Sequence, residues 1–261
     1  MTFGVQTFTV RREQRRGLRQ AYLPLAEMGI RNLEVARIDF DRKRAAELKA
    51  VTEELGLTVC SVQVKPKYIF GDPRGIIEFC KTVGCKNAVI SMLPFNCILG
   101  SEERFYSFLG TLDGACELYA KEGVTLGYHH HNWEYITLSG GRTRMQELIA
   151  GTRRLKFVHD TYWTAGCGAS PARQIEEFGD RLMGVHLRDL RLEGRGLDVL
   201  RRDCPIGDGV IDFSSVLRAA ERVGDPYLVI EQNTADPYGD VKRSLEGLAR
   251  AKNELEARPI I

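Results

Sequence analysis

Hydrophobic and polar positions follow two alternating patterns along the chain. Short runs rich in β-branched and apolar residues predict strands, and a longer segment with apolar residues every three or four positions follows each of them, as in an amphipathic helix. The predicted strands are residues 3–8, 32–36, 58–64, 87–92, 124–129, 155–160, 182–187 and 227–232. The predicted helices are residues 12–28, 41–55, 74–83, 102–122, 141–150, 171–179, 213–223 and 238–257.

Several of the junctions from helix to strand carry a glycine. These glycines are Gly29, Gly56, Gly84, Gly123 and Gly224. A glycine just past a helix readily adopts the left-handed conformation that ends it, and strands joined through helices in this way are parallel. An open doubly wound sheet would show a glycine-rich phosphate loop after the first strand, and none is present there. Eight repeats without this loop predict one α/β domain over residues 1–261, a closed (β/α)8 TIM barrel.

Composition and charge limit the kinds of protein and of partner that the sequence allows. With 43% hydrophobic and 28% charged residues, the chain can bury a large core. The net charge of +2, and the absence of a basic stripe interleaved with aromatic residues, argue against a nucleic acid partner. The basic cluster at residues 11–16 predicts a solvated helical turn or a contact to a small anion.

Cysteine use and hydropathy predict the compartment. The seven cysteines are scattered without a Cys-x-x-Cys pair, which indicates reduced apolar side chains. The chain begins without an apolar signal segment, and no stretch approaches 18 apolar residues. We therefore expect a cytoplasmic protein with no membrane partner.

Three of the five histidines lie together in the stretch at residues 123–135. Because side chains alternate along a strand, Gly127, His129 and His131 share one face. Small residues inside a closed barrel and ligands at its rim would produce this pattern. A solvated histidine run in a loop is the alternative.

Imidazole or carboxylate groups end four consecutive predicted strands. These residues are His129, Asp160, His186 and Glu231. The active site of a TIM barrel lies at the C-terminal ends of its strands, so these side chains are expected to meet there. Taken singly, Asp160 could cap a helix, His186 could be a core histidine and Glu231 could form an ion pair at the rim. Together they form a mixed nitrogen and oxygen set with two negative charges, which suits Mn²⁺, Co²⁺ or Zn²⁺ better than Ca²⁺.

Several motifs resemble the sugar phosphate isomerase/epimerase branch of the xylose isomerase-like barrels. They are Gly4-Val-Gln-Thr-Phe8, Tyr128-His-His-His-Asn-Trp-Glu134, Asp160-Thr-Tyr-Trp163, Val185-His-Leu-Arg-Asp189, Pro205-Ile-Gly-Asp-Gly-Val-Ile-Asp-Phe213 and Val229-Ile-Glu-Gln232. This resemblance covers the whole chain and includes the inosose dehydratase-like branch. It implies one divalent metal, most often Mn²⁺ with Mg²⁺ also in use, bound by Glu, Asp, His and Glu on strands five to eight.

The first ligand position departs from that pattern. Matched by position, Asp160, His186 and Glu231 are the last three ligands, but His129 stands where the resemblance implies a glutamate. Either His129 binds the metal as a neutral imidazole, or Glu134 folds back from the following loop. We favour His129 because a strand end is better preorganised than a loop.

The resemblance implies a metal-dependent isomerase or epimerase that acts on a small carbohydrate or polyol. The enzyme would abstract a proton α to a carbonyl and form an enediolate, with Glu231 as one acid/base group and His129 or His131 as the other. Further residues near the strand ends are candidates for substrate contacts. They are Gln6, Glu34, Lys65, Trp133, Trp163 and Arg188.

Three other functions stay open at this point. An inosose dehydratase-like or C-glycoside-cleaving lyase would expel a leaving group from the same enediolate, and the histidine-rich fifth strand resembles those lyases. An endonuclease-IV-like repair enzyme would need ligands for three zinc ions, more than five histidines readily supply. A sugar-binding barrel without catalysis is the last alternative. The sequence leaves open the substrate, its phosphorylation, the metal and the oligomeric state, a homo-oligomer included.

Overall fold

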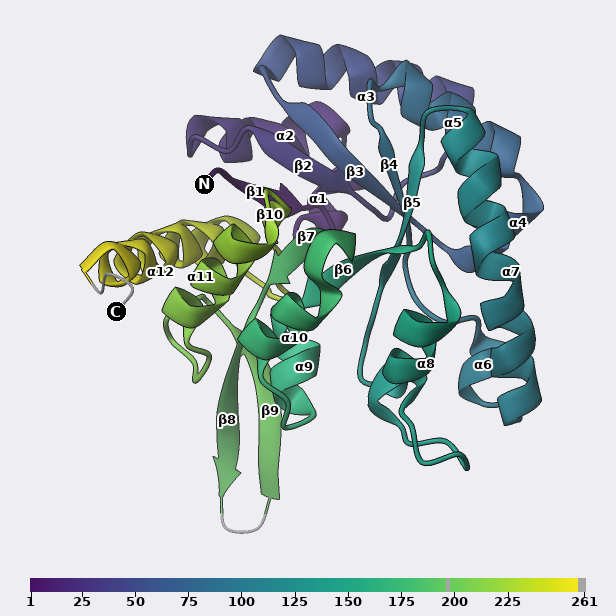
Figure 1. Cartoon of the computed structure of the whole chain (residues 1–261). Helices are drawn as coiled ribbons and strands as arrows, with labels where there is room; N and C mark the ends of the chain where they lie inside the picture. The colour runs from purple at the N-terminus through teal and green to yellow at the C-terminus, as the bar shows by residue number, and fades with distance from the viewer. Residues whose placement is uncertain (196–197, 258–261) are drawn as a thin grey trace.

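Eight parallel strands close into a barrel in the computed structural model, which describes residues 1–195 and 198–257 (Figure 1). Around the barrel the strands follow the order β1, β10, β7, β6, β5, β4, β3, β2. Their bounds are β1 Phe3–Gln6, β2 Asn32–Val35, β3 Thr58–Val64, β4 Asn87–Ile90, β5 Thr125–His129, β6 Lys156–Asp160, β7 Leu182–Leu187 and β10 Tyr227–Ile230. The predicted TIM barrel is confirmed.

Helices connect the strands around the outside of the barrel. The longer ones are α2 Leu18–Glu27, α3 Arg42–Leu55, α5 Pro73–Thr82, α7 Glu102–Lys121, α8 Arg144–Gly151, α10 Pro171–Phe178, α11 Phe213–Val223 and α12 Pro237–Ala257. Short helical turns are α1 Arg11–Gln14, α4 Pro66–Gly71, α6 Phe95–Ile98, α9 Thr161–Gly166, and the 3₁₀ turns η1 Trp133–Tyr135 and η2 Gly179–Arg181. The helix predicted at 12–28 is two helices, because Gly17 interrupts it with a φ of 149°.

Local sequence signals explain where the helices begin and end. Asp41 caps α3 by accepting the backbone N–H of Arg44 at 2.8 Å. Gly56 ends the same helix with a φ of 63°, in the left-handed region that glycine adopts without strain. The other predicted junction glycines also have positive φ values. These turns return the chain to the start of each next strand.

An antiparallel hairpin follows β7 and was not predicted. It consists of β8 Asp189–Arg195 and β9 Asp198–Cys204. Figure 1 shows it extending away from the barrel. Most of its residues are charged or polar, and the alternation of Leu190 and Leu192 with charged neighbours is a short strand signal that the prediction did not use.

The barrel interior is polar on the side of β2, β7 and β10. Glu34 lies inside and accepts hydrogen bonds from His186 and Tyr227, which project inward from the other two strands. Because side chains alternate along a strand, Leu33 and Val35 point outward and join the apolar layer between sheet and helices. The core therefore lies mainly outside the sheet, which leaves polar side chains free to gather within it.

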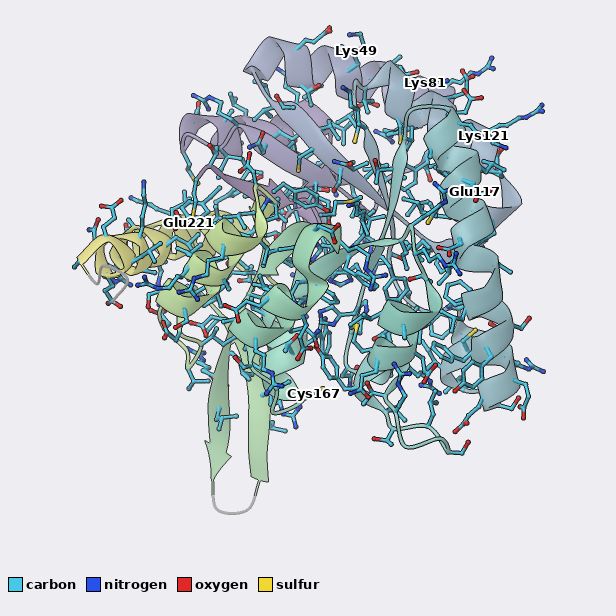
Figure 2. All side chains as sticks on the ribbon, in the orientation of Figure 1. Lys49, Lys81, Glu117, Lys121, Cys167 and Glu221 are labelled. Atoms are coloured by element: carbon cyan, nitrogen blue, oxygen red, sulfur yellow. The ribbon has the colours of Figure 1, made fainter. Side chains whose placement is uncertain are left out.

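Charged side chains cover the outer surface. Figure 2 shows this for Lys49, Lys81, Glu117, Lys121 and Glu221, which point away from the barrel. Among the residues that the structure describes, no helix combines the length and apolar character needed to cross a bilayer.

Gly247 lets α12 approach the loop after the hairpin, and its replacement should destabilise the barrel. A Cβ at this position would lie 1.8 Å from the carbonyl oxygen of Ile206, which is backbone and cannot rotate away. We expect Gly247→Ala to lower the free energy of unfolding by about 2 kcal/mol or more. Gly114→Ala is the matched control, because nothing lies within 4 Å of a Cβ there. In that exposed helix alanine should stabilise by roughly 0.5–1 kcal/mol. Denaturant unfolding measures both, and equal stabilities would contradict this packing.

Candidate metal centre

Four buried side chains meet at the C-terminal end of the barrel. They are His129 on β5, Asp160 on β6, His186 on β7 and Glu231 just beyond β10. One nitrogen or oxygen atom from each lies within 4.8 Å of those of the others. The structure thus brings together the four residues that end consecutive strands in the sequence.

His186 and Glu231 leave two buried polar atoms without a hydrogen-bond partner. His186 Nε2 lies 2.5 Å from Glu34 Oε1, and in the tautomer that donates this hydrogen the lone pair of Nδ1 is free. Nδ1 lies 2.7 Å from Glu231 Oε2, yet their geometry is not that of a hydrogen bond and neither atom has another partner. Two buried lone pairs that face each other favour a cation between them.

The pKa values of His186 and Glu231 also favour a cation at this position. Burial opposes protonation of His186, but Glu34 and Glu231 outweigh it and raise its pKa to about 10. Near neutral pH Nδ1 therefore holds a proton when no other cation is bound, and a metal ion would have to displace it. Burial would also raise the pKa of Glu231, but the Arg188 guanidinium and His186 outweigh it and lower that pKa to about 2. The position between the two side chains therefore stabilises positive charge.

His129 offers a second nitrogen to this centre. Its Nδ1 lies 3.3 Å from the carbonyl oxygen of Ser91, and its Nε2 lies 3.3 Å from Asp160 Oδ2. If Nδ1 donates its hydrogen to Ser91, the lone pair of Nε2 faces Asp160 Oδ2. The other carboxylate oxygen of Asp160 accepts the backbone N–H of Trp163 at 3.0 Å and caps α9. Asp160 thus caps a helix with one oxygen and keeps the other for the centre.

Arg188 lies beside the two carboxylates of the centre. Its Nη1 is 3.2 Å from Asp160 Oδ2 and 3.3 Å from Glu231 Oε1, while its Nη2 is 2.5 Å from Asp203 Oδ2. Against the effect of burial, Arg188 and His129 lower the pKa of Asp160. Both acids are therefore ionised, and two carboxylates with two imidazoles form a donor set that fits a divalent ion of borderline hardness.

Glu34 holds His186 from inside the barrel. One of its oxygens accepts from His186, and the other accepts from Ser61 and, at 2.6 Å, from Tyr227. The carboxylate is fully buried and lies outside the pocket wall. The structure thus places Glu34 away from the other residues predicted to contact substrate: its oxygens are occupied, and the side chain orients an imidazole.

Glu34→Gln should weaken metal binding without abolishing it. The amide oxygen can still accept from His186, but an NH₂ group then replaces the oxygen that accepts from both Ser61 and Tyr227, so the imidazole is less well oriented. Loss of such an outer partner costs about 10–100-fold in metal affinity. Calorimetric titration with Mn²⁺ measures the change, and an unchanged affinity would show that Glu34 has no such role.

Glu134 is not part of the four-residue group. Its two oxygens accept hydrogen bonds from the Tyr128 hydroxyl and, at 2.7 Å, from the backbone N–H of His131. This bonding holds the loop after β5. Of the two alternatives for the first ligand position, the geometry favours His129.

The two remaining histidines support the centre from behind. His130 Nε2 accepts the backbone N–H of Asp160 at 3.0 Å and lies 3.2 Å from His159 Nδ1. Burial, and then His129, lower the pKa of His130 to about 3, so it stays neutral and keeps this acceptor. The sequence did not indicate this role, because His130 and His159 lie on the strand face opposite to the ligands.

A pocket of about 770 Å³ opens above the four-residue group. Its wall contains four residues that the sequence indicated for substrate contacts, two of the candidate ligands and the acid/base candidate His131. The contacts are Gln6, Lys65, Trp163 and Arg188, and the ligands are His129 and Glu231. Trp133 is not on this wall. It stacks on His131 with ring centroids 4.8 Å apart and packs against the core.

His131 presents a neutral imidazole to the pocket. Burial, and then His129, hold its pKa well below the usual range. Its Nδ1 is buried without a hydrogen-bond partner. This nitrogen is available to exchange a proton or a hydrogen bond with a bound molecule.

Sequence reasoning also missed Tyr162 and Asp203, which line the pocket. Tyr162 lies within the Asp-Thr-Tyr-Trp motif, so a signal for it existed. Asp203 lies in β9, and without the hairpin nothing linked it to the strand ends.

The turn at Gly207 and Gly209 has no free N–H groups for an external anion. Asp189 Oδ2 accepts the N–H groups of both glycines at 2.9 Å, and its Oδ1 accepts those of Leu190 and Ile211. The anion at this turn is the protein's own carboxylate.

Comparison with known proteins gives matches over most of the chain. The sequence matches the family described as xylose isomerase-like TIM barrel over residues 24–253. It is 23% identical over 215 residues to an inosose dehydratase from Geobacillus kaustophilus, which covers 70% of this chain and 69% of that protein.

Solved structures share the fold at low identity. A sugar phosphate isomerase/epimerase from Parabacteroides distasonis has a TM-score of 0.78 at 18% identity, covering 96% of this chain and 94% of that one. A D-allulose 3-epimerase from Methylomonas sp. in complex with D-allulose has a TM-score of 0.72 at 16% identity, covering 96% and 97%. The IolI protein with a bound zinc atom has a TM-score of 0.73 at 14% identity and covers 98% of both chains. Because the matched family spans most of the sequence, the chain belongs to the xylose isomerase-like TIM barrel family.

Proposed function

We propose that this protein is a divalent metal-dependent enzyme that isomerises or epimerises a small carbohydrate through removal of a proton α to a carbonyl. One observation carries the proposal: the unpartnered His186 Nδ1 and Glu231 Oε2, which face each other in a four-residue group beneath a pocket. The zinc in one structural neighbour and the D-allulose in another support a divalent ion and a carbohydrate substrate.

His129, Asp160, His186 and Glu231 would hold the ion, for which Mn²⁺ is our first choice over Co²⁺, Zn²⁺ and Mg²⁺. When bound, the ion would supply Lewis-acid stabilisation of negative charge that develops on a substrate oxygen. The two carboxylates would balance the charge of the ion, and Asp203 balances that of Arg188. Because the ion and the Arg188 guanidinium would be fixed where negative charge develops on the substrate, they would stabilise an anionic transition state more than a neutral substrate.

Glu231 and His131 would transfer the proton. Glu231 reaches the pocket from β10 and His131 from the loop after β5, so they approach a bound molecule from different strands. One group would remove the α-proton and return it to the neighbouring carbon for isomerisation; for epimerisation, the other group would first take up a proton from solvent and then deliver it to the opposite face. Arg188 would donate to a substrate oxygen, and Trp163 would shield the reacting carbon from water.

A lyase is the second candidate. The inosose dehydratase relative and the histidine-rich end of β5 favour it. The same enediolate would then expel a β-hydroxyl group, and the abstracted α-proton would pass to the leaving oxygen through His131, so that water is released. A non-catalytic carbohydrate-binding barrel would need none of this chemistry.

Deuterium uptake tests the proposal. The Mn²⁺-loaded protein is incubated in D₂O with a panel of ketoses and inososes, and products are followed by NMR and mass spectrometry. We expect deuterium at the α-carbon, with an isomer of unchanged composition from an isomerase or a product that has lost water from a lyase. Chelator-treated protein is the control.

If the two groups pass the abstracted proton between them without contact with water, the same proton returns to the substrate and no deuterium is taken up. A substrate with deuterium at the reacting carbon should then turn over more slowly. A substrate that is converted with neither label uptake nor an isotope effect would rule out α-proton abstraction that exchanges with solvent or limits the rate.

A further inference from the structure

The pocket wall formed by the loops after β1, β2 and β3 carries an excess of positive charge. Its charged residues are Arg11, Arg15, Arg37, Asp39, Arg44 and Lys65. Arg44 pairs with Glu47 at 2.8 Å. Within residues 1–195 and 198–257, the other four cations form no ion pair with a carboxylate. Asp39 is the single acid among them, so this wall is not neutralised from within.

Arg11 is held in place at this wall. Its Nη1 donates to the carbonyl oxygen of Phe8 at 2.9 Å, and its Nη2 donates to Asn233 Oδ1 at 2.6 Å. Its guanidinium lies 3.9 Å from the centre of the Phe8 ring. Burial, followed by repulsion from Arg12 and Arg37, lowers the pKa of Arg11. Asn233 lies two residues beyond Glu231, and the fixed cation lines the same pocket as Glu231.

Arg37 is presented at the same place by a strained turn. It has a φ of 63° and is the single non-glycine residue with positive φ in the described part of the chain. Ala36 before it is fixed by Thr7 Oγ1, which bonds both its N–H and its carbonyl oxygen, and by Gln14 Nε2 at 3.2 Å. The Arg37 guanidinium lies 5.2 Å from the Phe8 ring. A strained residue persists where its surroundings impose it, and here they direct a second cation toward Phe8.

The pocket therefore has two poles. The candidate metal centre, with Asp160 and Glu231, forms the first. Arg11 and Arg37 form the second, which we call the arginine pair, with Arg15 and Lys65 nearby. Two guanidiniums held beside one ring repel each other, and hydroxyl groups of a neutral sugar would not offset that repulsion. A carboxylate or phosphate would, through charge-assisted hydrogen bonds in the fork geometry of arginine.

We propose that the substrate carries an anionic group, carboxylate or phosphate, remote from its reacting carbon, and that the arginine pair binds this group. The chemistry at the reacting carbon rests on the proposed function, whereas the anion site rests on the arginine pair alone. The proposal gives the basic cluster at residues 11–16 a specific role, through Arg11.

Binding of inorganic phosphate tests the anion site on its own. Equilibrium dialysis is carried out on chelator-treated protein, so that no metal contributes. We expect one saturable site in the wild type and affinity weakened about tenfold or more in Arg37→Gln, with further weakening at high salt. Arg37 is exposed, so this variant should fold normally. Arg16→Gln is the matched control, because Arg16 belongs to the same cluster but lies outside the pocket wall. Absence of saturable binding, or equal affinity in Arg37→Gln and wild type, would overturn the proposal.

Three ketoses that differ in one group show whether the anion site binds a phosphate or a carboxylate. D-fructose, D-fructose 6-phosphate and D-fructuronate differ only at C6, where they carry a hydroxyl, a phosphate or a carboxylate. In competition with inorganic phosphate, we expect one or both charged ketoses to bind about tenfold or more tightly than D-fructose. Equal competition by D-fructose would count against the arginine pair. Because these assays use metal-free protein, their outcome is independent of deuterium exchange, and either proposal can fail alone.

Discussion

A Glu231→Gln variant should lose α-proton exchange and turnover by about 10² or more. Glutamine keeps the size of the side chain but removes the negative charge that faces His186 Nδ1 and most of the basicity that proton abstraction needs. It also removes one of the two anionic donors from the centre. The loss should therefore appear in both deuterium uptake and product formation, measured at saturating Mn²⁺ so that weaker metal binding does not mimic it.

Glu221→Gln is the control for this variant. Glu221 is exposed on α11, far from the barrel mouth (Figure 2). Its replacement by glutamine removes the same single negative charge. It should exchange and turn over at the wild-type rate. If Glu231→Gln did the same, Glu231 would be neither an acid/base group nor a required ligand.

Asp160→Asn should lower the affinity for Mn²⁺ by about 10² or more, since loss of a ligand is expected to cost at least as much as loss of an outer partner. The amide oxygen can still accept the N–H of Trp163 and cap α9, so the loop should keep its conformation. What is lost is the charge on Oδ2, which faces His129 and Arg188. Calorimetric titration and the metal content after dialysis measure the effect.

Asp225→Asn is the matched control, because this exposed residue lies in the turn before β10, at the opposite end of that strand from Glu231. Circular dichroism should show that both variants are folded. Wild-type metal content in Asp160→Asn would remove Asp160 from the ligand set.

The four strand-end residues could be found from the sequence because of the topology. Once the strands are parallel and the barrel is closed, side chains on the inner face at the ends of consecutive strands lie near one another at the same end of the barrel. His129 and Asp160 end strands, His186 lies one residue before the end of β7, and the structure gathers them with Glu231. This inference needs only strand positions, which hydrophobic periodicity supplies.

How deep each side chain lies within the barrel could not be predicted in the same way. Glu34 is near a strand end, but β2 and β3 shift register between Leu33 and Glu34, and the carboxylate lies inside the barrel beneath His186. Trp133 follows the histidine run closely, but the η1 turn directs its ring against the core. Asp203 lies in β9, whose charged sequence carries no hydrophobic period and whose pairing with β8 was not predicted. Each of these positions is decided by local backbone geometry rather than by residue pattern.

A crystal structure of the protein soaked with Mn²⁺, with anomalous data, tests the central claim most directly. We expect one anomalous peak at the C-terminal end of the barrel, about 2.0–2.3 Å from an atom each of His129, Asp160, His186 and Glu231. For His186 that atom should be Nδ1, with Nε2 still bonded to Glu34. No peak at saturating Mn²⁺, or a peak bound by Glu134 with His129 turned away, would contradict the account.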